Sequence, residues 1–169
     1  MTLRESRPPL SEARTDPALP NGFTSVTPFI TVARARDAIE FYRHVFGVRV
    51  VDVTEVDGKV VHAELEFPSG RLQLGEPNDV YGLVAAGTDG DCYSLGHYCA
   101  DVDAVAARAV AAGAAIREPI TDFVTGDRYC SLRDPFGVRW SVMTRIEEIP
   151  EAEGARRVAE WAHTQQATT

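Results

Sequence analysis

His62 and Glu64 are the two residues of this 169-residue chain whose types and spacing best suit acid–base chemistry. They are two residues apart in a segment that alternates hydrophobic and polar side chains, so on a strand both would lie on one face. Histidine transfers protons near neutral pH because its ordinary pKa is about 6.5. Tyr129, Tyr98 and Asp127 are candidate donors to the same site. The sequence leaves open whether His62 serves such chemistry or is a structural strand residue bonded to a neighbour.

The elements that must position these residues occur twice. In each copy a strand is followed by a helix and three more strands, an order written βαβββ, and the helices end at Gly47 and Gly113. The first copy comprises strands Thr27–Val32, Val48–Val56, Val60–Phe67 and Arg71–Leu74 and a helix from Asp37 to Gly47. The second comprises strands Tyr93–Cys99, Ala114–Glu118, Asp127–Leu132 and Val138–Thr144, a helix Val102–Ala112 and a loop Pro119–Gly126. In the strand that holds His62, the side chains expected to face the helix are Val61, Ala63, Leu65 and Phe67. Two such units each leave an apolar face open and must pack on one another.

Around this repeat the chain divides into three regions. Residues 1–22, rich in proline and without periodicity, are expected to be a disordered arm. Residues 23–148 form the domain, with modules 24–76 and 92–146. Residues 149–169 are expected to form a C-terminal helix, Glu151–His163, and a tail.

Composition limits the partners. A net charge of −8 and a pI near 5.0 argue against nucleic acid or an anionic membrane surface, and make a neutral or cationic small molecule the easier ligand. No apolar stretch is long enough to span a bilayer, and no signal peptide is recognised. Three cysteines, Cys92, Cys99 and Cys130, lack a CxxC spacing and suit a reducing compartment. We therefore expect a cytoplasmic protein.

The repeat resembles the vicinal oxygen chelate superfamily, which includes glyoxalase I, extradiol dioxygenases, and bleomycin and fosfomycin resistance proteins. Within it, the chain is most similar to the PhnB-like branch over residues 26 to about 148. The resemblance implies an α+β fold in which two tandem βαβββ modules form a curled mixed sheet around a cavity, and it implies a homodimer. The motifs that carry it are Val26–Ile30, Ala38–Tyr42, His62–Leu65, Gly126–Tyr129 and Arg133–Gly137.

The same resemblance bears on metal binding. Enzymes of the superfamily supply His, Gln or Glu ligands from the first and last strands of each module, and those positions fall here on Thr27, Gln73, Ser94 and Ser141. Hydroxyl groups are poor ligands for zinc, nickel or iron, so only Gln73 is a plausible ligand. His97 could in principle join His62 and Glu64 as a third metal ligand, but alternation places it on the opposite, helix-covered face of its strand. We therefore expect no metal and no other cofactor.

The leading hypothesis is a metal-independent small-molecule-binding protein that sequesters a drug or metabolite. The first alternative is a metal-free enzyme with isomerase, lyase or cyclase chemistry on a carbonyl-containing metabolite, in which His62, Glu64 and Tyr129 would be catalytic. A second alternative is a dimeric structural module with a packed interior. Whether the cavity belongs to one chain or needs a second one stays open. The expected ligand-binding residues are Phe29, Thr31, Arg71, Gln73, Ser94, Tyr98, Asp127, Arg139 and Ser141.

Overall fold

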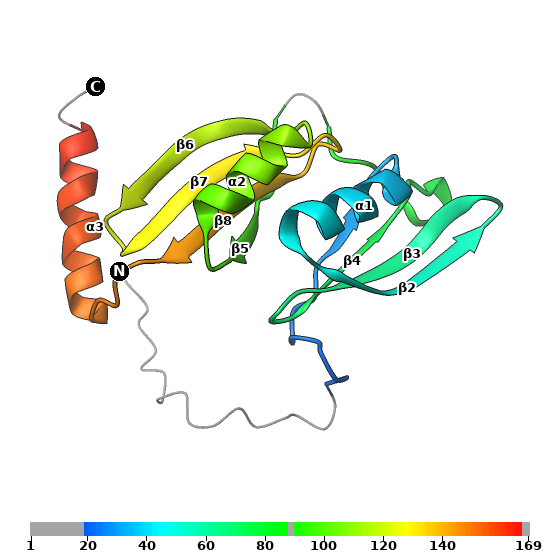
Figure 1. Cartoon of the computed structure of the whole chain (residues 1–169), viewed down its shortest axis with the longest axis horizontal. Helices are drawn as coiled ribbons and strands as arrows, with labels where there is room; N and C mark the ends of the chain where they lie inside the picture. Colours follow the sequence, from blue (N-terminus) through cyan, green and yellow to red (C-terminus); the bar gives the residue numbers. More distant parts are fainter. Residues whose placement is uncertain (1–18, 88–89, 167–169) are drawn as a thin grey trace.

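The computed structural model describes residues 19–87 and 90–166 of the chain, and within them it confirms two tandem βαβββ modules (Figure 1). The first module contains β1 (Phe29–Thr31), α1 (Ala35–Phe46), β2 (Arg49–Val56), β3 (Lys59–Glu66) and β4 (Arg71–Gly75). The linker includes a short 3₁₀ helix, η1 (Asp79–Tyr81). The second module contains β5 (Leu95–Tyr98), α2 (Val102–Ala111), β6 (Ala115–Phe123), β7 (Asp127–Arg133) and β8 (Arg139–Arg145), and α3 (Glu151–Gln166) follows it.

Each module forms its own mixed sheet with the same topology. The strand orders are β1-β4-β3-β2 and β5-β8-β7-β6, and the first strand of each module pairs in parallel with the last. The two sheets do not close into a barrel, so the expected cavity is not enclosed by a single chain (Figure 1). The strand registers make these positions equivalent: Phe29 and Gly96, Glu64 and Ser131, Gln73 and Ser141, Arg71 and Arg139.

One face of each sheet is covered by the helix of its module. In α1 the apolar residues recur at three- and four-residue spacing, so one side of the helix is buried against the sheet. The helix ends at Gly47, whose φ of 69° is the left-handed conformation that glycine adopts without strain. The fully buried residues of the two modules include Val45, Leu65, Leu74, Leu132 and Val142.

An aromatic cluster joins the two modules. The ring of Phe46 on α1 lies 4.5 Å from that of Trp140 on β8, measured between centroids. The His97 ring on β5 lies 5.1 Å from Phe46 and 5.2 Å from Phe67. His97 is therefore on the helix-covered face of its sheet, as its sequence position predicts, and not on the face of His62. Burial lowers its pKa.

A β-bulge changes the expected face of one residue on β3. The sequence pattern placed Val61 against the helix, but its neighbour Val60 is fully buried and Val61 is 38% exposed. Thr54 pairs with His62 and the next residue, Glu55, pairs with Val60, so Val61 is the extra residue of the bulge. From His62 onward the expected alternation holds.

The expected loop Pro119–Gly126 is partly wrong, because β6 continues to Phe123. The strand keeps pairing with β7 through an irregular register between Glu118 and Thr121. Proline is tolerated here because β6 is an edge strand, where a missing N–H donor leaves no neighbour unpaired.

The segments outside the modules are only partly as expected. The C-terminal helix reaches Gln166, three residues beyond its expected end. Most of the expected N-terminal arm lies outside the described residues, but residues near Phe23 pack on the first sheet, where that ring lies 4.6 Å from the Arg71 guanidinium. None of the helices in the described part of the chain is both long and apolar enough to cross a membrane.

Candidate functional site

We call the face of each sheet that its helix does not cover the open face. On the first sheet the open face carries Phe29, His62, Glu64, Arg71 and Gln73, because these residues alternate with the buried residues of β1, β3 and β4. The His62 ring lies 6.2 Å from that of Phe29. Five of the residues predicted from the sequence are thus brought together.

Glu64 is the centre of the polar contacts on this face. Its carboxylate accepts hydrogen bonds from Arg71 Nη1 at 2.5 Å and from Gln73 Nε2 at 3.4 Å. The side chains of Arg71 and Glu64 are only 14% and 17% exposed. The carboxylate is therefore held by residues of β4, whereas the His62 ring packs toward Phe29. Glu64 and His62 share a face without forming the acid–base pair that their spacing allowed.

The open face of the second sheet carries Ser94, Tyr98, Arg139 and Ser141. The hydroxyl oxygens of Ser94 and Ser141 lie 2.8 Å apart and share a hydrogen bond. Tyr98 is 55% exposed on the edge strand β5. Two of the four positions that the sequence resemblance equates with metal ligands are thus hydrogen-bonded to each other.

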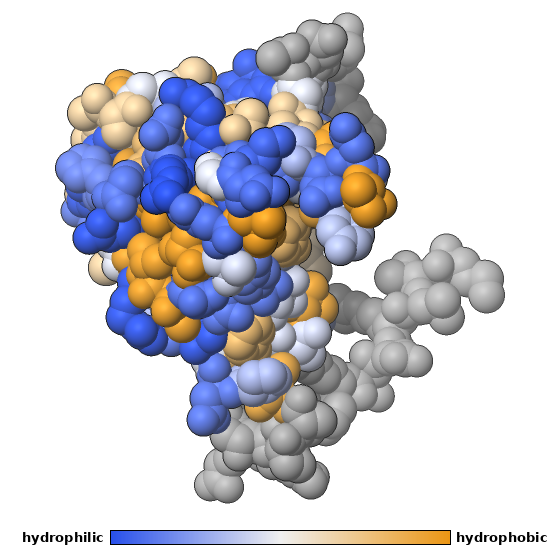
Figure 2. Space-filling view, turned by 90° about the vertical axis from the view of Figure 1, so that its right-hand side faces the viewer, coloured by the Kyte–Doolittle hydropathy of each residue, from blue (hydrophilic) through white to orange (hydrophobic). Residues whose placement is uncertain are grey.

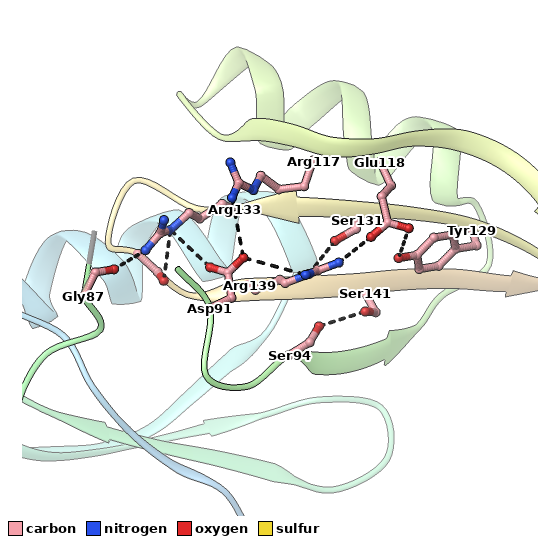
Figure 3. Close-up of polar contacts among 11 residues, drawn as sticks. Gly87, Asp91, Ser94, Arg117, Glu118, Tyr129, Ser131, Arg133, Arg139 and Ser141 are labelled. Carbon is pink, nitrogen blue, oxygen red and sulfur yellow. Dashed lines mark hydrogen bonds and ion pairs between the residues drawn. The ribbon is translucent and has the colours of Figure 1, made fainter. Parts of the chain in front are cut away.

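A second polar network extends across β6, β7 and β8 (Figure 3). Glu118 accepts hydrogen bonds from Tyr129 Oη at 3.0 Å and from Arg139, and Arg139 Nε donates to Ser131 Oγ at 2.9 Å. Sequence reasoning missed Glu118, although its pairing with Ser131 in the register places it beside the predicted residues. Arg139 binds Ser131 as its repeat equivalent Arg71 binds Glu64.

The predicted catalytic group is divided between the two sheets. His62 and Glu64 lie on β3, and Tyr129 lies on β7 with Glu118 as its partner (Figure 1). Asp127 lies at the start of β7, where its carboxylate contacts Arg145 Nε at 3.1 Å and Thr125 Oγ1 at 3.0 Å. It is 6% exposed and holds the hairpin end of the sheet.

Two predicted threonines are less available than expected. Thr31 is only 8% exposed at the end of β1. Thr27 precedes β1, and its hydroxyl donates a hydrogen bond to the Thr24 carbonyl at 3.0 Å. Neither therefore offers a free hydroxyl group to a ligand in the single chain.

A cleft of about 400 Å³ lies at the junction of the modules. Its walls come from the turn 68–70 and β4 on one side and from β5 on the other, and include Arg71, Tyr98 and Trp140. Two of the predicted ligand-binding residues thus reach one cleft from different modules. Its volume is within the range of small-molecule sites.

Among the described residues, no group of three or more His, Cys, Asp or Glu side chains is arranged to hold a metal ion. Of the four ligand-equivalent positions, Ser94 and Ser141 have hydroxyl groups that are hydrogen-bonded to each other. The Thr27 hydroxyl group is bonded to the backbone, and the fourth position carries the amide of Gln73. The residues at these four positions do not fit a transition-metal site, because hydroxyl and amide groups are weak ligands for transition metals.

Comparisons with known proteins agree with this architecture. A family model described as the Glyoxalase/Bleomycin resistance protein/Dioxygenase superfamily matches residues 23–142. An uncharacterized protein of Mycobacterium bovis is 34% identical over 133 residues, which cover 74% of this chain and 86% of the relative. The crystal structure of TioX from Micromonospora sp. ML1 is 28% identical, with a TM-score of 0.55 over 71% of this chain and 95% of TioX. A PhnB protein from Bacillus cereus shares the fold at 22% identity, with a TM-score of 0.56 over 72% of this chain and 99% of that protein. The chain therefore belongs to the glyoxalase/bleomycin resistance protein/dioxygenase superfamily.

Proposed function

We propose that this protein binds a small organic molecule without a metal ion and does so as a homodimer. In the dimer, the open face of the first sheet of one protomer and that of the second sheet of its partner enclose the ligand. The observation that carries the proposal is that both open faces combine aromatic and polar side chains, yet remain uncovered in a single chain. Phe29 is 39% exposed and Tyr98 is 55% exposed.

The composition of the open faces suits a ligand site. Small-molecule sites are mostly apolar surfaces with a few fixed polar groups that orient the ligand. Phe29 and Tyr98 supply aromatic surface, and the polar groups are held in place: Glu64 by Arg71, and Glu118 by Tyr129. Such fixed groups reduce the conformational entropy lost on binding.

Metal independence is supported by the hydrogen bond between Ser94 and Ser141. A bound transition ion at these positions would need deprotonated or strongly donating ligands, and a serine hydroxyl group is neither. Gln73, the remaining candidate, donates to Glu64. Binding by shape, stacking and hydrogen bonds uses the residues that are present.

The homodimer is supported by apolar surface on the first module and the adjoining linker. Val56, Val61 and Tyr81 are 53%, 38% and 76% exposed, and Figure 2 shows hydrophobic patches among hydrophilic residues at this end of the molecule. Val56, Val61 and Tyr81 also line a common hollow between the β2–β3 hairpin and the linker. Contiguous exposed apolar surface is typical of interfaces, and here it adjoins the open face that carries Phe29. A second copy of the chain would cover both this apolar surface and the open face of the first sheet.

Light scattering and a thermal-shift screen of aromatic metabolites and drugs test the proposal. We expect a dimer and at least one compound that raises Tm, because a ligand that binds only the folded state stabilises it. Tyr98→Ala should abolish that shift, whereas Val110→Ala, at a similarly exposed position (48%) on α2, should leave it unchanged.

Three results would contradict the proposal. A monomer at all concentrations rejects the shared pocket. Stoichiometric metal in protein purified without added ions rejects metal independence. A His62→Ala variant that keeps its affinity but loses turnover of the compound would assign catalysis instead of sequestration.

A further inference from the structure

Three arginines from three neighbouring strands converge on one carboxylate at the linker end of the second sheet (Figure 3). Arg133 Nε lies 3.5 Å from Asp91 Oδ1, and Arg117 Nη2 and Arg139 Nη1 lie 3.9 and 3.8 Å from Asp91 Oδ2. The arginines belong to β6, β7 and β8, whereas Asp91 belongs to the linker. We call Arg117, Arg133 and Arg139 the arginine cluster.

Asp91 satisfies this cluster incompletely. Its side chain is only 6% exposed, yet among the described residues its buried Oδ1 accepts no hydrogen bond. Charge-assisted hydrogen bonds between guanidinium and carboxylate groups are about 2.7–2.9 Å long, well below the 3.5–3.9 Å separations found here. The cluster therefore has room for a carboxylate that approaches it more closely.

Two of the three arginines are held more firmly than the carboxylate. Arg139 is fixed by Ser131 and Glu118, and Arg133 donates to the backbone carbonyls of Gly137 and Gly87. Asp91 lies in an irregular segment before β5, so its displacement breaks no strand pairing. Two preorganised arginines are thus occupied by an anion that belongs to no helix or strand.

The local charge also differs from that of the whole chain. Although the net charge is −8, the ion pairs that the three guanidinium groups form within the described residues involve two carboxylates, those of Asp91 and Glu118. If Asp91 leaves, the ion pair between Arg139 and Glu118 remains, and the cluster loses the carboxylate that all three arginines approach. An anionic group is therefore attracted to this end of the open face, in contrast to the cationic ligand that the overall charge suggests.

We propose that the arginine cluster binds the carboxylate of a small-molecule ligand and that Asp91 occupies the site until the ligand displaces it. This inference rests on the proposed function, since Arg139 and Ser141 lie on one face of β8, and it names the ligand class: a carboxylate-bearing small molecule. Binding exchanges one carboxylate for another, so the cluster never loses its counter-ion.

The rival explanation is that Asp91 is only a structural clamp that ties the linker to the second sheet. A clamp requires the carboxylate of Asp91 itself, and a carboxylate ion in solution would not stabilise the protein in its place. The proposal differs because removal of the Asp91 side chain should create a site for an external carboxylate of similar shape. Acetate is a suitable probe because it matches the side chain of aspartate.

The experiment compares wild type with Asp91→Ala in sodium acetate and in sodium chloride at equal ionic strength and pH. With acetate at ten times its Kd, we expect the Tm of Asp91→Ala to be about 4 °C higher than in chloride. Wild type should bind acetate at least tenfold more weakly, because its own carboxylate competes. Asp91→Ser serves as a second variant if the alanine variant does not fold.

Two controls make the result specific. Asp91→Ala/Arg139→Ala should lose the acetate effect. Asp103→Ala removes a carboxylate from Arg128, an exposed pair outside the cluster, and should gain no acetate effect. Equal Tm values in acetate and chloride for both Asp91 variants would overturn the proposal in favour of the clamp, and equal acetate affinity in wild type and variant would overturn the role of Asp91.

The outcome is separable from that of the proposed function. The cluster lies within one chain and is probed without the natural ligand. Acetate binding by a monomer would reject the shared pocket but keep the carboxylate site. A dimer that binds aromatic compounds but no acetate would keep the shared pocket and reject the carboxylate site.

Discussion

Tyr42 on α1 donates a 2.7 Å hydrogen bond to Asp134 Oδ2 and thereby joins the first module to the Asp-Pro-Phe-Gly turn of the second. The same oxygen accepts Trp140 Nε1 at 3.0 Å, and Oδ1 accepts the backbone N–H groups of Phe136 and Val138, each at 2.9 Å. Burial raises the pKa of Asp134, and burial together with this carboxylate raises the pKa of Tyr42. The modules thus meet at a buried polar centre whose donors and acceptors are matched.

Tyr42→Phe should lower the free energy of unfolding by about 1–3 kcal/mol, because a buried carboxylate loses one of its donors. Urea denaturation measures the change. Val110→Ala removes two methyl groups from a residue of α2 that is 48% exposed and should change stability by less than about 0.5 kcal/mol. Equal effects of the two substitutions would mean that the Asp134 bond contributes nothing to stability.

Alternation along strands was enough to predict part of the site. It placed His62, Glu64 and Gln73 on a shared face and His97 on the opposite, buried face. This succeeded because side-chain direction on a strand depends only on local geometry. The bulge at Val61 reversed the pattern locally, since a bulge depends on how two strands pair.

The polar partners of these site residues could not be predicted from local sequence patterns. Glu118 became a partner of Tyr129 and Arg139 through the irregular register in which β6 pairs with β7. Asp91 reached the arginine cluster because the linker folds back on the second sheet. Neither relationship has a fixed sequence spacing, so only the tertiary structure could identify them.

His97 should make stability depend on pH below neutrality. Burial lowers its pKa in the folded state, so on acidification the unfolded chain takes up the proton first. The stability contribution is complete above the unfolded pKa of about 6.5 and falls by up to about 1.4 kcal/mol per pH unit as pH decreases toward the folded pKa.

Urea denaturation of wild type and His97→Leu between pH 7.5 and about 4.5 tests this dependence. Leucine keeps an apolar side chain beside Phe46 and Phe67 but cannot titrate. The stability difference between variant and wild type should therefore shift in favour of the variant as pH falls. Parallel pH curves for the two proteins would exclude His97 as the titrating group.

Gly126 should tolerate alanine poorly for two separate reasons. Its φ of 84° is left-handed, and an added Cβ would meet the Glu147 carbonyl oxygen at 2.4 Å. Gly82 has a similar φ of 64° but no atom within 4 Å of such a Cβ, so Gly82→Ala measures backbone strain alone. We expect a loss of about 1–2 kcal/mol for Gly82→Ala and a larger loss for Gly126→Ala. Equal losses in thermal or urea unfolding would mean that the Glu147 segment moves aside freely.

The last prediction concerns α3, which is held to the second module by few contacts. The Trp161 ring lies 5.3 Å from that of Phe123 at the end of β6, and Arg157 forms an ion pair with Glu147 at 2.8 Å. Trp161→Ala removes an aromatic contact that contributes about 0.5–1.5 kcal/mol beyond its buried area. Because the ion pair is largely exposed, it is too weak to hold the helix alone.

Hydrogen exchange measured by mass spectrometry should therefore show faster exchange in residues 151–166 of Trp161→Ala, with the sheets unchanged. Arg156→Ala is the matched control, since Arg156 bonds only to Glu153 and Glu160 among the described contacts and these lie in the same helix. In Arg156→Ala, hydrogen exchange in residues 151–166 should increase much less. If both variants exchange alike, the helix is stabilised mainly by its own ion pairs, and the Phe123 contact does not dock it.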